Sequence, residues 1–189
     1  MSGKWLDTSL LRVVLISAIA AAIVHICATF AISHFSATPA YQRLAPRLPL
    51  NALVLLPPPT PNAQLLPFQA PDMHYAMCRF DASQSPVVVK ASLPERGWTL
   101  AVYSPEGDNF YAIPGQEQRR TEINAVLVPQ GDSWMGNWTV ASLTDRNLTE
   151  IQTPSPRGLL VIQAPVKGQA YRREVEAELA RASCSALRP

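Results

Sequence analysis

The sequence predicts an α+β protein, with a single N-terminal transmembrane helix followed by an antiparallel β-rich domain that a C-terminal helix covers. Three observations support this prediction. Residues 13–32 have no formal charge, several short strand-like segments follow residue 72, and residues 169–183 have helical periodicity. Runs of strands followed by one helix are typical of the α+β class.

The uncharged run VVLISAIAAAIVHICATFAI at 13–32 has the length that a helix needs to cross a bilayer. A cleavable signal peptide is the alternative, but its apolar region normally spans about 7–15 residues and precedes an A-x-A-like site. The best downstream candidate for such a site, 38–40, has a proline inside the motif. We therefore predict a short leader over residues 1–12 and an uncleaved transmembrane helix over residues 13–35.

The orientation of this helix depends on the residues around it. Lys4 and Arg12 precede the apolar run, and Arg43 and Arg47 follow it. The number of positive side chains is therefore equal on the two sides, and only the N-terminal amine adds a charge in front of the run. A leader of this length is too short to form a domain, and we expect it to stay in the cytoplasm. The chain is thus predicted to be a single-pass protein of the bacterial inner membrane with its C-terminal domain in the periplasm.

One face of the predicted transmembrane helix could contact a partner. Small residues let another helix approach closely, and histidine or threonine can hydrogen-bond across such a contact. An ionisable group near the middle of a bilayer is costly and by default suggests a function or a partner. The alternative is a lone anchor with a neutral histidine. Besides the lipid bilayer, we expect another membrane or envelope protein as partner, on the face formed by Ala18, Ala22, His25, Thr29 and Ser33.

Residues 36–71 are predicted to be a proline-rich stalk. Residues 39–71 contain nine of the 18 prolines of the chain. Because proline fixes φ and lacks a backbone donor, this region cannot form a long helix or a central strand. A semi-rigid spacer is favoured over a docking motif for an aromatic groove. The apolar part, PLNALVLLP at 49–57, is expected to lie along the domain or near the lipid surface.

A periplasmic β-rich domain is predicted over residues 72–189. Its strand-like segments are β-branched or alternate between apolar and polar residues. Pro and Gly in SPEG at 104–107 indicate the turn of a hairpin. The final strand is almost entirely apolar and is therefore predicted to be central. The predicted strands are 86–91, 98–103, 109–113, 122–128, 138–143 and 158–164.

A helix is predicted to close the chain over residues 169–183. Arg172 and Glu176, four residues apart, support its solvent face. Its apolar residues recur at helical spacing and should pack on the sheet. This stripe consists of Tyr171, Val175, Leu179 and Ala182.

Three motifs resemble a bacterial family of domains of unknown function, numbered 1254: MCRFD at 77–81, the aromatic pattern WTLAVYxxxGxNFY at 98–111, and YRREVEAELARASC at 171–184. The likeness covers residues 40–184. Small members of this family have one N-terminal membrane helix and a β-rich domain, so the resemblance implies the same architecture here. No activity is established for these small members, and the resemblance therefore implies no chemistry.

Two cysteines lie at the two edges of the predicted domain, and the third, Cys27, lies within the apolar run. In an exported protein, such cysteines are paired more often than free. We therefore predict a disulfide between Cys78 and Cys184. If the domain were cytosolic, both thiols would be reduced.

No catalytic motif of a hydrolase, zinc protease or phosphate-binding loop is present in the sequence. The strongest metal candidate is DMHYAMC at 72–78, where Met73 and Met77, and His74 and Cys78, are four residues apart. Sulfur and imidazole ligands suit copper. We favour the alternative, a short helical entry to the core, and predict no metal and no cofactor. The net charge of +2, without clustered basic residues, argues against nucleic acid as a partner.

Two functional classes remain open. The first is a non-enzymatic accessory or protein-interaction module of the cell envelope, which we favour. The alternative is a small-ligand-binding or metal-binding periplasmic domain, or an unrecognised enzyme, with a pocket between sheet and helix near Trp98, Tyr103 and Tyr111. Core packing is the stronger interpretation of these aromatic residues. A pocket with convergent polar groups would favour the second class, and a flat apolar patch the first.

Overall fold

The computed structural model describes residues 3–35, 38–60, 64–67, 69–131 and 148–187, and it includes no side chains for 3–8 and 33–35. The chain divides into two compact units, Met1–Thr38 and Pro39–Pro189. Each is described here by itself.

The first unit is the helix α1, Gly3–Phe35. Its segment Ser9–Ile32, 24 residues long, is apolar enough to cross a membrane, and a signal sequence has the same properties. The described side chains of this segment are all exposed. A single apolar helix at the N-terminal end of the chain is thus confirmed.

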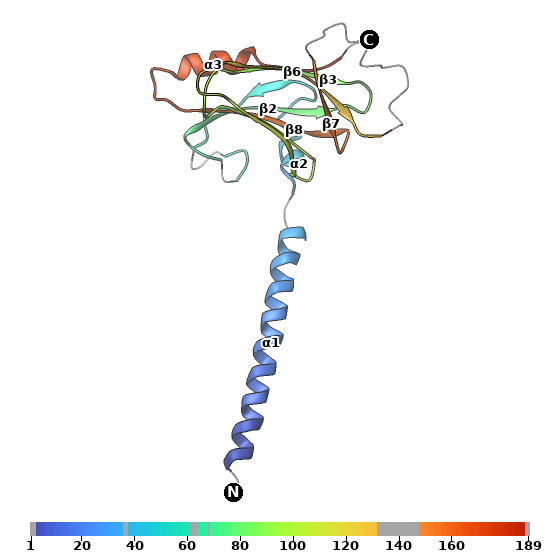
Figure 1. Cartoon of the computed structure of the whole chain (residues 1–189), viewed down its shortest axis with the longest axis vertical. Coiled ribbons are helices and arrows are strands. Elements are labelled where there is room, and N and C mark those ends of the chain that lie inside the picture. Colours follow the sequence, from blue (N-terminus) through green and yellow to red (C-terminus); the bar gives the residue numbers. More distant parts are fainter. Residues whose placement is uncertain (1–2, 36–37, 61–63, 68, 132–147, 188–189) are drawn as a thin grey trace. The chain divides into compact units, whose positions relative to one another are not determined.

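The second unit is a sandwich of two β-sheets, drawn in Figure 1. A five-stranded sheet has the order β1-β2-β8-β4-β5, and a four-stranded sheet has the order β7-β6-β3-β9. All neighbouring strands are antiparallel except β6 and β7, which are parallel. The strands of the first sheet are β1 Leu53–Leu55, β2 Met73–Asp81, β4 Thr99–Tyr103, β5 Asn109–Pro114 and β8 Arg157–Pro165. Those of the second are β3 Val87–Leu93, β6 Thr121–Pro129, β7 Thr149–Thr153 and β9 Ser183–Ala186.

This architecture confirms the predicted α+β class. Five of the predicted strands correspond to β3, β4, β5, β6 and β8, and β8 is central in its sheet, as expected from its apolar composition. The strand predicted over residues 138–143 lies outside the described residues. Strands β1, β2, β7 and β9 were not predicted.

Alternate residues of the strands form the main core between the two sheets. Even-numbered residues of β2 and β8, such as Phe80 and Ile162, face Val89 and Leu127 of the other sheet within one buried cluster. This alternation follows from the two-residue repeat of a strand. A single apolar core therefore holds both sheets together.

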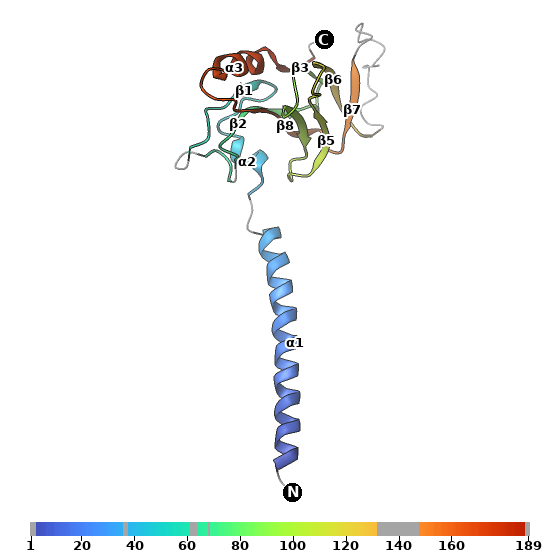
Figure 2. The ribbon, with the colours of Figure 1, turned by 60° about the vertical axis from the view of Figure 1, so that its left-hand side comes forward.

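The helix α3, Arg172–Arg181, closes the side of this core. It contacts β3 of one sheet and β1, β2 and β8 of the other, and it buries Val175 and Leu179. Figure 2 shows α3 beside β1 and β3. Tyr171, predicted on the same packed stripe, is the N-cap residue of α3 and is 52% exposed, so it does not contribute to the buried face.

The described residues between 39 and 71 do not form the predicted stalk. The short helix α2, Ala40–Leu44, and the chain after it lie against the outer face of the five-stranded sheet. Leu44, Leu48 and Leu56 are buried there against Tyr75, Met77, Leu159 and Val161. The domain therefore begins at Pro39 and not at residue 72.

The physical reason is that β2 and β8 have apolar side chains on both faces. A spacer would leave the outer face of their sheet in water. The prolines are compatible with this role because β1 is a three-residue edge strand that ends before Pro57. Asn51, at φ 52°, adds a second attachment: its Oδ1 accepts from the Asp81 N–H at 2.8 Å, and its Nδ2 donates to the Asp81 carbonyl at 3.1 Å.

Candidate functional site

The predicted disulfide is present between Cys78 of β2 and Cys184 of β9. Their Cα atoms are 6.4 Å apart, and both residues are buried. The bond joins the two sheets through the main core. Cys78 was expected to precede the first strand, whereas it lies inside β2.

The residues of the metal candidate are not brought together. Residues 73–81 form a strand instead of the expected helical entry, so neighbouring side chains point to opposite faces. Met73 and Met77 pack in the outer cluster, whereas Cys78 is in the main core and is already bonded. Within the described part of the chain, no group of three or more His, Cys, Asp or Glu residues could hold a metal ion.

The predicted partner face of the membrane helix lies on α1. Ala18, Ala22 and His25 are exposed in this unit. The Thr29 hydroxyl donates to the backbone carbonyl of His25 at 2.8 Å, within the same helix. The side chain of Ser33 lies outside the described part. The function of this face stays a prediction.

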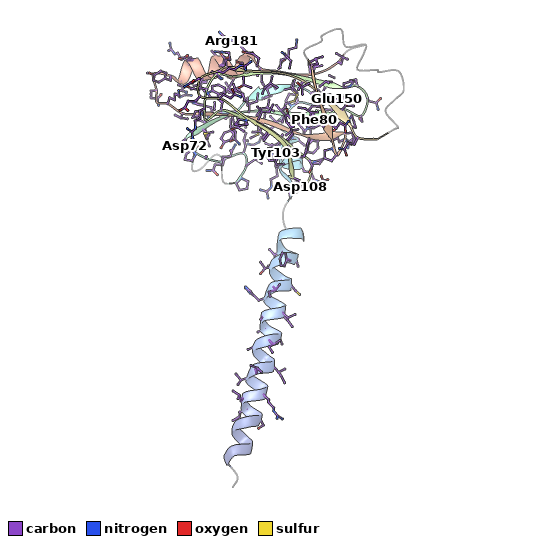
Figure 3. All side chains as sticks on the ribbon, viewed as in Figure 1. Asp72, Phe80, Tyr103, Asp108, Glu150 and Arg181 are labelled. Atoms are coloured by element: carbon purple, nitrogen blue, oxygen red, sulfur yellow. A yellow bond between two sulfur atoms is a disulfide. The ribbon has the colours of Figure 1, made fainter. Side chains whose placement is uncertain are left out.

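The domain has a pocket of about 260 Å³ on the outer face of the five-stranded sheet. Strands β2, β4 and β8 form its floor, and α2 forms its wall together with Leu66, Pro67 and Gln69. Of the three aromatic residues named for a pocket, only Tyr103, labelled in Figure 3, lines it. Trp98 is buried in the main core and Tyr111 packs against that core, as expected from core packing. The pocket that Tyr103 lines is on the outer face of the sheet and is not lined by the C-terminal helix.

Tyrosine rings and aliphatic side chains dominate the lining of this pocket. Tyr41, Tyr75 and Tyr103 contribute three rings, and Leu159 and Val161 of β8 contribute part of the floor. None of the described residues that line it is charged. The pocket therefore resembles the sites that bind small molecules, which are mostly apolar with a few placed polar groups.

Three of the polar groups in the pocket hold its walls. The Tyr75 hydroxyl accepts from the Ala70 N–H at 3.0 Å. The Gln69 Oε1 accepts from the Leu65 N–H at 3.2 Å. The Ser104 hydroxyl oxygen accepts from the Asp108 N–H at 3.3 Å. Each bond fixes backbone next to the pocket, so the pocket is formed without a ligand.

Gln163 differs from these three groups. It lies on β8 between Tyr75 of β2 and Thr99 of β4, and it is only partly buried. Its carboxamide makes no hydrogen bond within the described part of the chain. It therefore keeps donors and an acceptor for a bound molecule.

Charged groups lie behind one wall of the pocket. The Arg79 guanidinium is 5.4 Å from the centre of the Tyr41 ring, a cation–π distance. Burial raises the pKa of Tyr41, although the charge of Arg79 opposes this effect. Tyr41 therefore presents a neutral phenol to the pocket at neutral pH.

Asp81 forms an ion pair with Arg157 at 2.9 Å near the end of β2. Burial acts to raise the pKa of Asp81, but hydrogen bonds from Ser83 and Arg157 outweigh burial and lower it. The carboxylate is thus ionised and committed to local structure, and neither it nor Arg157 lines the pocket.

Residues 50–185 match the model of a family described as a protein of unknown function, DUF1254. The chain belongs to the DUF1254 family. The match includes strands β1 to β8, most of β9 and both bonded cysteines, and it confirms the resemblance seen in the motifs. No curated protein matches the chain in sequence.

A solved structure is similar to this DUF1254 chain in fold. The crystal structure of the VPA0106 protein from Vibrio parahaemolyticus has a TM-score of 0.57 to it at 15% sequence identity. The likeness covers 78% of this chain and 34% of that protein, so this chain spans about a third of its length. At this identity the likeness shows the fold alone.

Sequence reasoning missed most of the pocket. Tyr41, Leu66 and Gln69 belong to the region predicted as a stalk, and Tyr75 and Met77 to the region predicted as a helical entry. A usable signal was the apolar segment 49–57, which was expected to lie along the domain. The residues that line the pocket come from segments far apart in the sequence, and no local sequence pattern shows that these segments meet.

Proposed function

We propose that this chain is a single-pass protein of the bacterial inner membrane that holds its β-sandwich in the periplasm. There the domain acts as a non-enzymatic accessory that binds another envelope protein. The observation that best supports the proposed location is the buried disulfide between Cys78 and Cys184, in a chain with an exposed apolar helix at its N-terminal end.

The disulfide supports an orientation with the C-terminal domain in the periplasm. The equal numbers of positive side chains on the two sides of the apolar run did not decide this orientation. Disulfides persist in oxidising compartments and are rare in the cytosol. A 24-residue apolar segment is long enough to span the hydrocarbon core of a bilayer. Together these features favour an anchor with the domain on the periplasmic side.

A labelling experiment tests this topology. Gln118 is exposed in the loop between β5 and β6, so a Gln118→Cys variant offers an accessible thiol. In a Cys27→Ser background that keeps the disulfide, Gln118→Cys should react with a membrane-impermeant maleimide in spheroplasts. A Ser2→Cys variant is the matched control and should react only after lysis. The reverse pattern would place the domain in the cytoplasm and reject the proposed location.

The partner face on α1 gives a second test, which concerns association. Ala22→Leu should reduce recovery of a co-purifying membrane protein in a mild-detergent pull-down, because a larger side chain prevents close helix packing. His25→Leu should weaken association by about 1 kcal/mol. Ile16→Ala, on the opposite face, is the control and should change little. Full recovery of the same partners by a chain with a polyleucine span would show that the helix is only a tether.

The pocket on the outer sheet face favours a second candidate function, the binding of a small molecule by the same domain. Its lining is mostly apolar with a few polar side chains, which is the composition expected of the ligand-binding class. The two functions are compatible, since the pocket lies on the sandwich and the proposed partner face lies on α1.

A further inference from the structure

We infer that the pocket between α2 and strands β2, β4 and β8 binds a small neutral compound of one or two rings that has one hydrogen-bonding group. This inference rests on the second candidate function, for which it specifies the class of ligand, and it is independent of the proposed topology and partner. It rests on the volume, the lining and the one uncommitted amide of the pocket.

The volume sets the size of the ligand. An apolar cavity of about 150 Å³ can hold benzene, so the 260 Å³ observed here suffices for one or two rings. Pockets for drug-sized ligands span about 300–1,000 Å³, and this pocket lies below that range. A long lipid chain or a peptide would therefore extend outside it.

The lining sets the chemistry of the ligand. Aromatic rings prefer offset or edge-to-face contacts with other rings, which Tyr41, Tyr75 and Tyr103 provide. The sulfur of Met77 adds a favourable contact with an aromatic ring. Because no described lining residue is charged, an ionic ligand would lose hydration without gaining a partner. The guanidinium of Arg79 stacks on Tyr41 and is not part of the lining.

Gln163 sets the position of the polar group. Tyr75, Gln69 and Ser104 already accept hydrogen bonds from the backbone, whereas the Gln163 amide has no hydrogen bond within the described residues. On the same strand, Leu159 and Val161 offer apolar surface to the rings. The Tyr41 and Tyr103 hydroxyls also make no hydrogen bond within the described residues, but Gln163 lies on β8 itself, beside this apolar surface. A ligand hydroxyl is therefore expected beside Gln163, with its rings over β8.

The pocket also has the rigidity that binding favours. Its wall is attached to the sheet through Leu44 and Leu48, which are fully or almost fully buried. A site that is already ordered loses less conformational entropy when a ligand binds. Binding therefore requires no folding of the wall.

The probes for the test are 1-naphthol, naphthalene and 1-naphthoate, measured by equilibrium dialysis with the full chain in lipid nanodiscs. Empty nanodiscs correct for partition into lipid. We expect 1-naphthol to saturate one site per chain. Ala40→Trp should block this site and weaken binding at least about tenfold, because residue 40 lines the pocket. Ala112→Trp, an exposed position on the same sheet outside the lining, is the matched control and should bind normally.

A second variant keeps the inference testable if Ala40→Trp does not fold. Gln163→Leu preserves the size of the side chain and removes its hydrogen-bonding groups. It should therefore lower the affinity for 1-naphthol by about 3- to 10-fold and leave the affinity for naphthalene unchanged. Three results would overturn the inference. The first is no saturable binding of 1-naphthol above that of empty nanodiscs, and the second is an equal loss of affinity for 1-naphthol and naphthalene in Gln163→Leu. The third is binding of 1-naphthoate as tight as that of 1-naphthol. None of these results bears on the topology or the partner of the chain.

Discussion

Removal of the disulfide by Cys184→Ala should lower the free energy of unfolding of the sandwich by about 2–5 kcal/mol. The bond closes a loop between residues that are 106 positions apart, and the chain-entropy model assigns about 4–5 kcal/mol to a loop of this length. Alanine avoids burying a serine hydroxyl without a partner. The free energy is measured by urea unfolding, followed by tryptophan fluorescence.

Two comparisons make this result specific to the bond between Cys78 and Cys184. Wild-type protein with reductant should unfold at a urea concentration close to that of Cys184→Ala. Cys27→Ser should unfold like the oxidised wild type, because Cys27 belongs to α1 and is not bonded. If reduction leaves the unfolding midpoint of the wild type unchanged, the disulfide does not stabilise the sandwich. Hydrogen exchange should also increase in β9, which the bond attaches to β2.

Leu44→Ala and Leu48→Ala should each destabilise the domain by about 2–5 kcal/mol, although both lie in the region that reads as a proline-rich spacer. Their exposed fractions are 0% and 2%, so each truncation leaves a cavity under the outer face of the sheet. Unfolding of the full chain in urea measures this effect. Tyr75 and Met77 should become accessible to solvent in these variants.

Leu55→Ala is the matched control in the same region. Leu55 is 36% exposed on the edge strand β1, so its truncation should cost less than about 1 kcal/mol. If all three leucine variants unfold like the wild type, residues 39–66 act as a spacer after all, and the outer face of the sheet needs no cover.

The strands that could be predicted are those with a clear local pattern. Val87, Val89 and Ala91 are buried and alternate with less buried neighbours in β3, and β8 is almost continuously apolar. Strand β2 was missed because its core residues are buried on both faces, which removes alternation. Its pairs of Met, and of His and Cys, four residues apart also imitate a helical spacing. Strands β7 and β9 are short and largely polar, so they have little signal of their own.

The sequence by itself determined the features that depend on local chemistry. An apolar run of this length can only be a helix that is buried in lipid or protein, and two cysteines outside it leave a single intramolecular pairing. The motifs around residues 77–81, 98–111 and 171–184 also sufficed to identify the DUF1254 family.

Only the tertiary structure decided how distant segments share a surface. The proline-rich region became the cover of a sheet because β2 and β8 present apolar side chains outward, which no reading of residues 39–71 alone could show. Gly158 is another case: a Cβ atom there would lie 2.4 Å from the Phe80 ring and 2.5 Å from the Tyr103 carbonyl, so the need for glycine arises from two other strands. The pocket has the same origin. Packing between distant segments brings Tyr41, Tyr75 and Tyr103 together, and their positions in the sequence do not indicate that they meet.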